Sequence, residues 1–199
     1  CPTLLFYYRF IVHKTMKKLL ILGCTGSIGT SALNIAREFP TKFKVVGLTA
    51  HNSKEKLEKL SQEFGDVPVC LTGKELPEAL EKFISSCGAD IAVNGIAGSS
   101  GLLPSVYVLR SGMDLALANK ETIVMAGPLV AQLAQKHHCK ILPVDSEHSA
   151  VFTLVQKFGA EAIAEIVLTA SGGPFREKKR EDLPFMKPAD ALKHPTWDM

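Results

Sequence analysis

The sequence lacks cysteines in CxxC spacing, an apolar run of roughly 20 residues and a strong excess of charge of one sign. Its five cysteines are scattered along 199 residues, which argues against a disulfide framework or a zinc site and favours reduced thiols. Without a long apolar run, no membrane span is predicted. A formal net charge of +3 is too small to indicate nucleic-acid binding. We therefore expect a globular cytoplasmic protein, with a plastid location left open.

The first fifteen residues form a segment of different character. They begin without methionine, are rich in aromatic residues and share no periodicity with the rest of the chain, whereas Met16 opens a clean strand pattern. We interpret Met16 as the natural start and residues 1–15 as a non-native or unstructured extension. A signal peptide is an alternative, although its small-residue cleavage site is missing.

Short apolar runs alternate with amphipathic segments from Lys18 to about residue 145. The runs predict strands at 19–22, 43–48, 67–71, 90–93, 114–118 and 140–144, and helices at 27–39, 53–64, 78–86, 101–111 and 127–138. Strands separated by helices of this length indicate βαβ units and a parallel sheet covered on both faces. The predicted fold class is α/β, with a Rossmann-type doubly wound domain over residues 16–145.

The pattern changes after residue 145. A helix is predicted at 149–158 and a strand at 163–170, which opens into Ser171-Gly-Gly-Pro174. The remaining residues are rich in proline and charge. We expect residues 146–199 to be the incomplete beginning of a second, α+β catalytic domain.

The first βα turn carries three glycines, in the sequence Gly23-Cys-Thr-Gly-Ser-Ile-Gly29. Such a turn allows the backbone to approach a pyrophosphate and packs a helix closely on the sheet, while free amides and the helix dipole face the phosphates. Glycines after a strand at this position therefore predict a dinucleotide site. A tight turn without a ligand is the alternative.

The end of the second predicted strand, Leu48-Thr-Ala-His-Asn-Ser53, contains no acidic residue. NAD-specific domains place an Asp or Glu there to accept a hydrogen bond from the ribose 2′-hydroxyl. Small and polar residues, with His51 backed by Lys54, suit a 2′-phosphate better, so we predict NADPH rather than NADH. Alternatively, His51 is an ordinary exposed loop histidine.

Two carboxylates, Asp145 and Glu147, come directly after the predicted strand 140–144. Carboxylates at the carboxyl edge of a sheet can bind Mg²⁺ or Mn²⁺ together with substrate oxygens, although short acidic pairs are also common in solvated loops and at helix N-termini. Lys120, after the strand 114–118, could reach a substrate oxyanion, unless it is merely solvated.

Five motifs occur in an order that resembles the 1-deoxy-D-xylulose 5-phosphate reductoisomerase family, from about Met16 to Met199. The motifs are Gly23-Cys-Thr-Gly-Ser-Ile-Gly29, Leu117-Ala-Asn-Lys-Glu121, Val144-Asp-Ser-Glu-His-Ser-Ala150, Ala170-Ser-Gly-Gly-Pro-Phe175 and His194-Pro-Thr-Trp-Asp-Met199. The resemblance implies an enzyme of non-mevalonate isoprenoid biosynthesis. It would rearrange deoxyxylulose phosphate and reduce the product with NADPH to 2-C-methyl-D-erythritol 4-phosphate. A homodimer is expected of the full-length protein.

The resemblance also implies roles for individual residues. Those expected at the cofactor are Thr25, Gly26, Ser27, Ile28, Ala50, His51, Asn52, Asn119 and Glu121. Asp145 and Glu147 would bind the metal and act in catalysis with Lys120. The substrate would contact Lys120, Ser146, Glu147, Ser171 and His194, under a flexible lid that includes Trp197 and Met199. Ala50 and His51 depart from the Gly-Lys or Gly-Arg that the family commonly has there.

Two other functions remain open. One is a different NADP-dependent reductase, such as a homoserine or semialdehyde dehydrogenase, although these reactions do not require Asp145-x-Glu147 together with the Ser171-Gly-Gly turn. The other is a nucleotide-binding module without catalysis. Members of the resembled family are longer, and their third metal carboxylate lies beyond Met199. We therefore expect the 199-residue chain alone to bind NADPH but to be inactive.

Overall fold

A computed structural model describes residues 16–74, 76–167 and 172–193. The strands are β1 (Lys17–Leu22), β2 (Phe43–Ala50), β3 (Val69–Leu71), β4 (Ile91–Asn94), β5 (Asp114–Leu117) and β6 (Ile141–Pro143). The α-helices are α1 (Ser27–Glu38), α2 (Lys54–Glu63), α3 (Pro77–Ser86), α4 (Leu102–Arg110), α5 (Lys120–Lys136), α6 (Ser146–Phe158) and α7 (Pro188–Ala191). Short 3₁₀ helices are η1 (Gly98–Gly101), η2 (Ala160–Ala162) and η3 (Arg180–Phe185).

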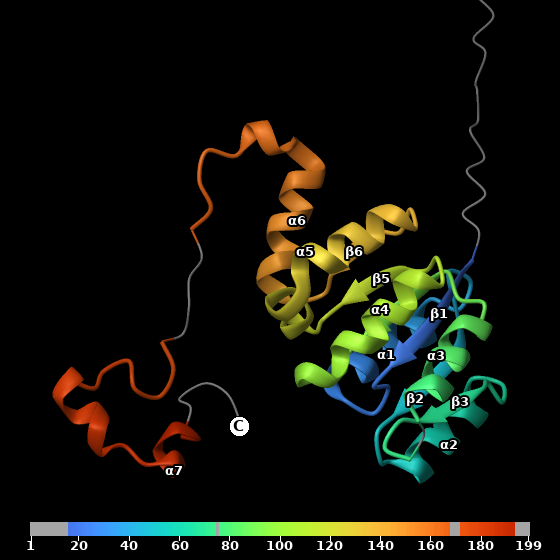
Figure 1. Cartoon of the computed structure of the whole chain (residues 1–199), viewed down its shortest axis with the longest axis horizontal. Coiled ribbons are helices and arrows are strands. Elements are labelled where there is room, and N and C mark those ends of the chain that lie inside the picture. The colour runs from blue at the N-terminus through green and yellow to red at the C-terminus, as the bar shows by residue number, and fades with distance from the viewer. Residues whose placement is uncertain (1–15, 75, 168–171, 194–199) are drawn as a thin grey trace, which may run out of the picture. The chain divides into compact units, whose positions relative to one another are not determined.

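The described strands form one six-stranded sheet in the order β3-β2-β1-β4-β5-β6, and all neighbouring pairs are parallel (Figure 1). This order is that of the Rossmann fold, in which the chain reverses direction across the sheet between β1 and β4. The prediction of a Rossmann-type doubly wound sheet is therefore confirmed. Leu22 pairs with Asn94, and Leu117 pairs with Pro143, so the loops after these strands share one edge.

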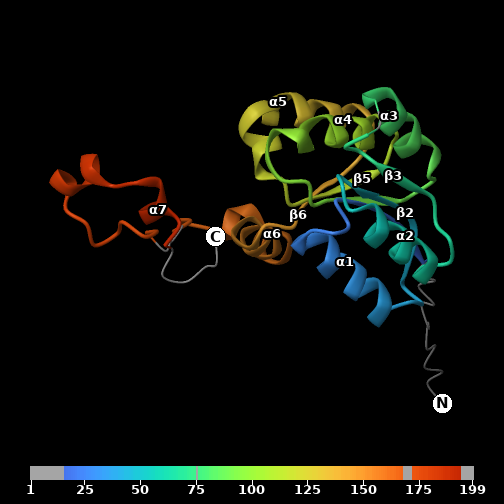
Figure 2. The ribbon, with the colours of Figure 1, turned by 90° about the horizontal axis from the view of Figure 1, so that it is seen from below.

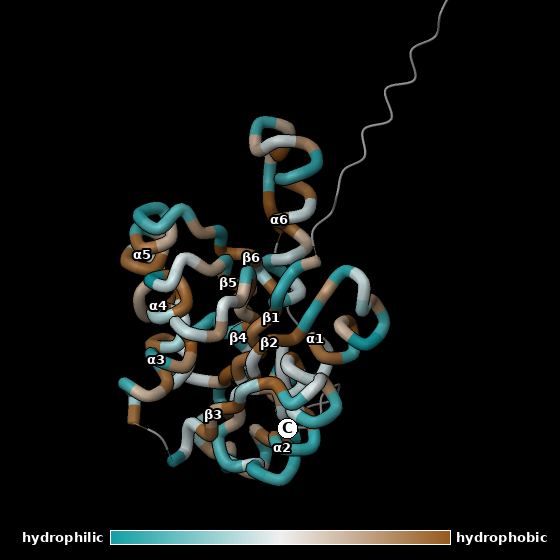
Figure 3. Tube along the Cα trace, turned by 90° about the vertical axis from the view of Figure 1, so that its right-hand side faces the viewer, coloured by the Kyte–Doolittle hydropathy of each residue, from teal (hydrophilic) through white to brown (hydrophobic). Residues whose placement is uncertain are grey.

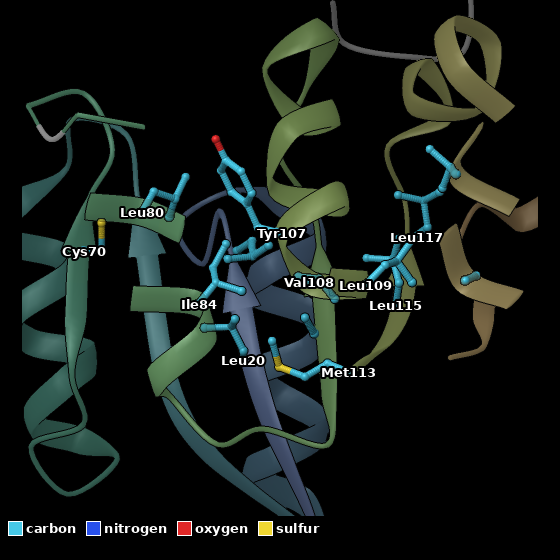
Figure 4. Close-up of a cluster of buried hydrophobic side chains, with 14 residues drawn as sticks. Leu20, Cys70, Leu80, Ile84, Tyr107, Val108, Leu109, Met113, Leu115 and Leu117 are labelled. Carbon is cyan, nitrogen blue, oxygen red and sulfur yellow. The ribbon is translucent and has the colours of Figure 1, made fainter. Parts of the chain in front are cut away.

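Alternate residues of β1 face opposite sides of the sheet and enter two separate cores. Leu20 and Leu22 pack in a cluster with residues of α3, α4 and α5, whereas Leu19 and Ile21 pack with residues of α1 and α2. Figure 2 shows these two groups of helices on opposite faces, and Figure 3 shows hydrophobic segments in the strands as well as in parts of the helices. Figure 4 shows labelled side chains of the first cluster, which extend from Cys70 on one side of the view to Leu117 on the other. The period-2 pattern of a strand thus produces the double winding.

The largest boundary error concerns α5, which begins at Lys120 and not at residue 127. The Gly127-Pro128 pair resembles a helix start, because proline is favoured in the first turn. Here Pro128 lies inside the helix, and the backbone departs from helical geometry at Ala126, with φ −147° and ψ 26°. Proline lacks the N–H and crowds the preceding turn. The helix is therefore kinked at Ala126, and the predicted helix start at residue 127 is wrong.

The described residues divide into two compact units, one up to Thr153 and the other from Leu154 onward. In the second unit, residues 163–167 are not a strand, so the predicted strand 163–170 is wrong over that part; residues 168–170 lie outside the described ranges. A strand requires a hydrogen-bonding neighbour, and none of the six described strands pairs with this segment. The predicted domain limits at 15/16 and 145/146 stay predictions.

No helix in the described part of the chain has the length and apolar character that crossing a membrane requires.

Candidate functional site

The glycine turn is shaped by close backbone packing between β1 and α1. Gly23 has φ +76°, which glycine tolerates best, and a Cβ on Gly29 would lie 2.6 Å from the Cys24 Cα. The turn is tied to β2, because the Cys24 N–H donates to the Thr49 carbonyl at 2.8 Å and the Gly23 N–H donates to Thr49 Oγ1 at 3.1 Å. The first and last glycines of the motif are therefore required sterically.

A cavity of about 520 Å³ opens beside this turn. Of the predicted cofactor residues, Thr25, Gly26, Ala50 and His51 line it. Gly26 is the N-cap of α1, and no side-chain hydrogen bond caps that helix, so its first amides face the loop without a side-chain partner. Such a helix start is a favourable seat for phosphate.

The other predicted cofactor residues of the first two βα turns lie beside the cavity without lining it. Ser27 is the exposed first residue of α1, and Asn52 is exposed after β2. Ile28 is half-buried, and its Cβ lies 3.1 Å from the position that a Cβ on Gly95 would take. Ile28 therefore packs α1 against the loop after β4.

The far side of the cavity is apolar and was not predicted. It is formed by Leu76, Pro77, Leu80, Leu103, Pro104 and Tyr107, from the starts of α3 and α4 and the loop before α3. Leu76 and Leu103 are exposed, at 71% and 54%. The segments that contain Leu76 and Leu103 carry no recognisable motif, so their place at the cavity could not be predicted from the sequence. They lie opposite the glycine turn only once the sheet has folded. The surface suits a flat apolar group such as a nucleotide base.

The end of β2 carries no acid next to the cavity. His51 Nδ1 lies 3.3 Å from Thr72 Oγ1, and the Gly73 N–H donates to the His51 carbonyl at 2.9 Å. None of the residues that line the cavity in the described part of the chain is Asp or Glu. Lys54, expected to support His51, is instead 3.6 Å from Glu58 Oε1 in the next turn of its helix.

Asn119, which is predicted to contact the cofactor, makes its hydrogen bonds within the protein. It is the N-cap of α5, and its Oδ1 accepts from the Thr122 N–H at 2.9 Å. Its amide nitrogen donates to the carbonyls of Ile96 and Gly98, both at 2.8 Å, and lies 3.1 Å from Glu121 Oε2. Asn119 therefore fixes the loop after β4, part of which lines the cavity.

Lys120 and Asp145 come together at the same sheet edge, as the register of Leu117 with Pro143 dictates. Lys120 Nζ lies 3.7 Å from Asp145 Oδ2, and the side chains are 64% and 17% exposed. His148 Nδ1 lies 2.9 Å from Asp145 Oδ1; since an ionised carboxylate only accepts, Nδ1 is the donor. Burial raises the pKa of Asp145, but hydrogen bonds and positive charge from His148 outweigh it and lower that pKa overall.

Glu147 lies in the first turn of α6, two residues after Asp145, and its Oε2 accepts from Ser146 Oγ. Ser146, Glu147 and His148 are all exposed. No cluster of three or more His, Cys, Asp or Glu side chains suited to a metal occurs among the described residues. The predicted ligands Asp145 and Glu147 thus supply at most two protein carboxylates here, both oxygen donors of the kind that Mg²⁺ prefers.

The predicted substrate contacts Ser171 and His194, and the predicted lid residues Trp197 and Met199, lie outside the described residues.

Comparison with known proteins gives consistent matches. Residues 19–127 match the family model described as 1-deoxy-D-xylulose 5-phosphate reductoisomerase, and residues 141–199 match the model for its C-terminal domain. The chain is 44% identical over 189 residues to the reductoisomerase of that name from Treponema pallidum (strain Nichols), covering 93% of this chain and 50% of the relative. Identity to the Treponema denticola protein is 47% over 191 residues, with 92% and 50% covered.

A solved structure of DOX-P reductoisomerase in complex with NADPH, fosmidomycin and magnesium superposes with a TM-score of 0.77 and 33% identity. The match covers 92% of this chain and 52% of that chain. The chain therefore spans about half the length of the curated relatives it matches.

Proposed function

Because the chain belongs to the 1-deoxy-D-xylulose 5-phosphate reductoisomerase family, we propose that it supplies the NADPH domain and part of the metal site of such an enzyme. The enzyme rearranges and reduces 1-deoxy-D-xylulose 5-phosphate to 2-C-methyl-D-erythritol 4-phosphate, with NADPH and Mg²⁺ or Mn²⁺. A relative of known structure is described with NADPH and magnesium. Family membership also favours this reaction over that of a homoserine or semialdehyde dehydrogenase. A cytoplasmic homodimer is part of the same proposal for the longer protein.

The cavity beside the glycine turn fits NADPH. Close packing at Gly23 and Gly29 leaves room for backbone, not side chains, so the turn can approach a pyrophosphate. The opposite wall is apolar and suits the adenine ring. The absence of an acid among the described lining residues favours a phosphorylated ribose, because a carboxylate would repel it.

Asp145 and Glu147 would hold the divalent ion, which would polarise the substrate carbonyl when bound. Beyond these two carboxylates, the ion in the longer protein would take its ligands from the third carboxylate that the family resemblance implies, from water and from substrate oxygens. Lys120, whose ammonium lies 3.7 Å from Asp145, would offset negative charge that develops on a substrate oxygen. His148 fixes the Asp145 carboxylate through its 2.9 Å contact, so this ligand is oriented before the ion arrives.

The observation that carries the proposal is the common edge of one sheet. The loops after β1, β2 and β4 enclose the cavity, while the loops after β5 and β6 bring Lys120 to Asp145. Ligands of open α/β sheets bind at the carboxyl ends of the strands. A nicotinamide in this cavity could therefore transfer hydride to a substrate held at the neighbouring strand ends. If Asp145 and Glu147 were only solvated loop residues, there would be no reason for Lys120 to lie beside Asp145.

The test is turnover in a protein that carries this sequence at the full length of its relatives, followed as NADPH oxidation with deoxyxylulose phosphate and Mn²⁺. We expect Asp145→Asn or Glu147→Gln to reduce turnover by at least about 100-fold, because loss of a group that only supports a metal ligand already costs about 10- to 100-fold. Fluorescence titration should show NADPH affinity nearly unchanged. Glu38→Gln, an exposed acid at the end of α1, is the matched control. Near-normal turnover by either site variant at low Mn²⁺ would refute the assigned ligands.

For the 199-residue chain alone, a nucleotide-binding module without catalysis is the second candidate. The observation that favours it is the lack of a third metal-binding side chain among the described residues. Sustained NADPH oxidation by the purified 199-residue chain would exclude this candidate.

A further inference from the structure

Lys56 reaches the glycine turn from a different element. It lies in the first turn of α2, and its Nζ donates to the Thr25 carbonyl at 3.3 Å. Thr25 lines the cavity, and α2 begins four residues after the end of β2. The ammonium of Lys56 therefore contacts the loop after β1, which is one of the two loops that border the ribose end of a dinucleotide in this fold.

No acid in the described part of the chain forms an ion pair with Lys56. Lys54 on the same helix, in contrast, lies 3.6 Å from Glu58. The field of Lys56 also reaches into the turn: burial raises the pKa of the Cys24 thiol to about 11, and the Lys56 charge acts in the opposite direction. Among the described residues, Lys56 is thus an uncompensated cation at the turn, and Lys54 is a compensated one.

An ammonium group has three hydrogen-bond donors, and the Thr25 carbonyl occupies one of them. The Lys56 side chain is exposed, so its other donors are open to a ligand from solvent. His51, at the end of β2, is the one basic side chain among the described residues that line the cavity, and it contacts Thr72. His51 and Lys56 are therefore two basic side chains near the end of β2 that can donate hydrogen bonds to a phosphate dianion.

We propose that Lys56 recognises the ribose 2′-phosphate of NADPH and is a specificity-determining residue for this cofactor. The pyrophosphate is served by the amides at the start of α1, behind Gly26, so it does not need this lysine. The 2′-phosphate, in contrast, belongs at the end of β2, where no acid lies. This inference rests on the proposed function.

The experiment titrates NADPH and NADH into the 199-residue chain and follows nicotinamide fluorescence at low salt. The variants are Lys56→Met, which keeps the length of the side chain without its charge, and Lys56→Arg, which restores the charge. Lys59→Met is the matched control, because it removes one exposed positive charge from the same helix. Circular dichroism spectra establish that each variant is folded.

We expect Lys56→Met to raise the Kd for NADPH by about five- to tenfold, the range for a charge-assisted contact at a partly exposed site. The Kd for NADH should change by less than about twofold, Lys56→Arg should restore NADPH binding, and Lys59→Met should leave both affinities unchanged. An equal loss for NADPH and NADH would place Lys56 at the pyrophosphate and overturn the proposal. So would an unchanged NADPH affinity in Lys56→Met.

The proposed function and this inference fail in different ways. If the unsubstituted chain binds neither dinucleotide, the proposed function fails and the role of Lys56 falls with it. If the unsubstituted chain binds NADPH and Lys56→Met binds it equally well, only the role of Lys56 is refuted.

Discussion

Replacement of Asn119 by alanine should destabilise the first unit, because its side chain makes five hydrogen bonds, three of them to backbone groups. The cap to the Thr122 N–H contributes about 1 kcal/mol. The Ile96 and Gly98 carbonyls each lose a donor at 2.8 Å in a partly buried site, at about 0.5–1 kcal/mol each. Together these losses predict a decrease of about 2–3 kcal/mol in the free energy of unfolding.

Urea unfolding followed by circular dichroism measures this loss. With a urea dependence of about 2 kcal/mol per molar, the midpoint of Asn119→Ala should fall by about 1–1.5 M. Asn119→Ser keeps an oxygen that can cap α5 but cannot donate to both carbonyls, so it should recover about 1 kcal/mol. An unchanged midpoint for Asn119→Ala would refute the hydrogen-bond account. Equal midpoints for Asn119→Ala and Asn119→Ser would refute the contribution of the helix cap but not that of the other hydrogen bonds.

Two further predictions concern glycine packing and a buried thiol. Gly101→Ala should lower the free energy of unfolding by about 1–3 kcal/mol in the same urea assay, because its Cβ would lie 2.5 Å from Asn119 Cγ. Gly127→Ala is the control and should lower it little, because its Cβ would meet Ile123 at an ordinary 3.4 Å. Equal losses in the two variants would contradict the packing account. Cys24 is fully buried and its pKa is raised from 9.0 to about 11, so mass spectrometry should find it unlabelled by iodoacetamide at mildly alkaline pH in the folded chain and labelled in urea. Since the unfolded thiol ionises first, this group should also lower stability as the pH rises from 9.0 towards about 11.

The parallel sheet could be predicted because its central strands are buried on both faces and have a strong apolar pattern. In β1 the residues Leu19 to Leu22 are all buried, and helices of ordinary length separate the strands. Local signals failed where a tertiary contact decided the outcome. Gly127-Pro128 resembles a helix start, yet α5 continues through it with a kink at Ala126. Residues 163–167 have the composition of a strand but no described neighbour with which to pair.

The candidate site divides in the same way. Asp145 and Lys120 could be predicted as neighbours, because parallel strands end at one edge and the pairing of Leu117 with Pro143 sets their register. The apolar wall with Leu76 and Leu103 could not, since it forms only when the starts of α3 and α4 meet opposite the glycine turn.

Motif membership does not by itself reveal what a side chain does. Asn119 and Lys120 are adjacent in one motif, yet Asn119 is 2% exposed and engaged by the protein itself, whereas Lys120 is exposed towards Asp145. Conversely, Lys56 belongs to no motif but places a charge 3.3 Å from a carbonyl of the glycine turn. In this fold the motif fixes the backbone that faces the ligand. A side chain from a neighbouring helix, Lys56, then places a charge beside that backbone.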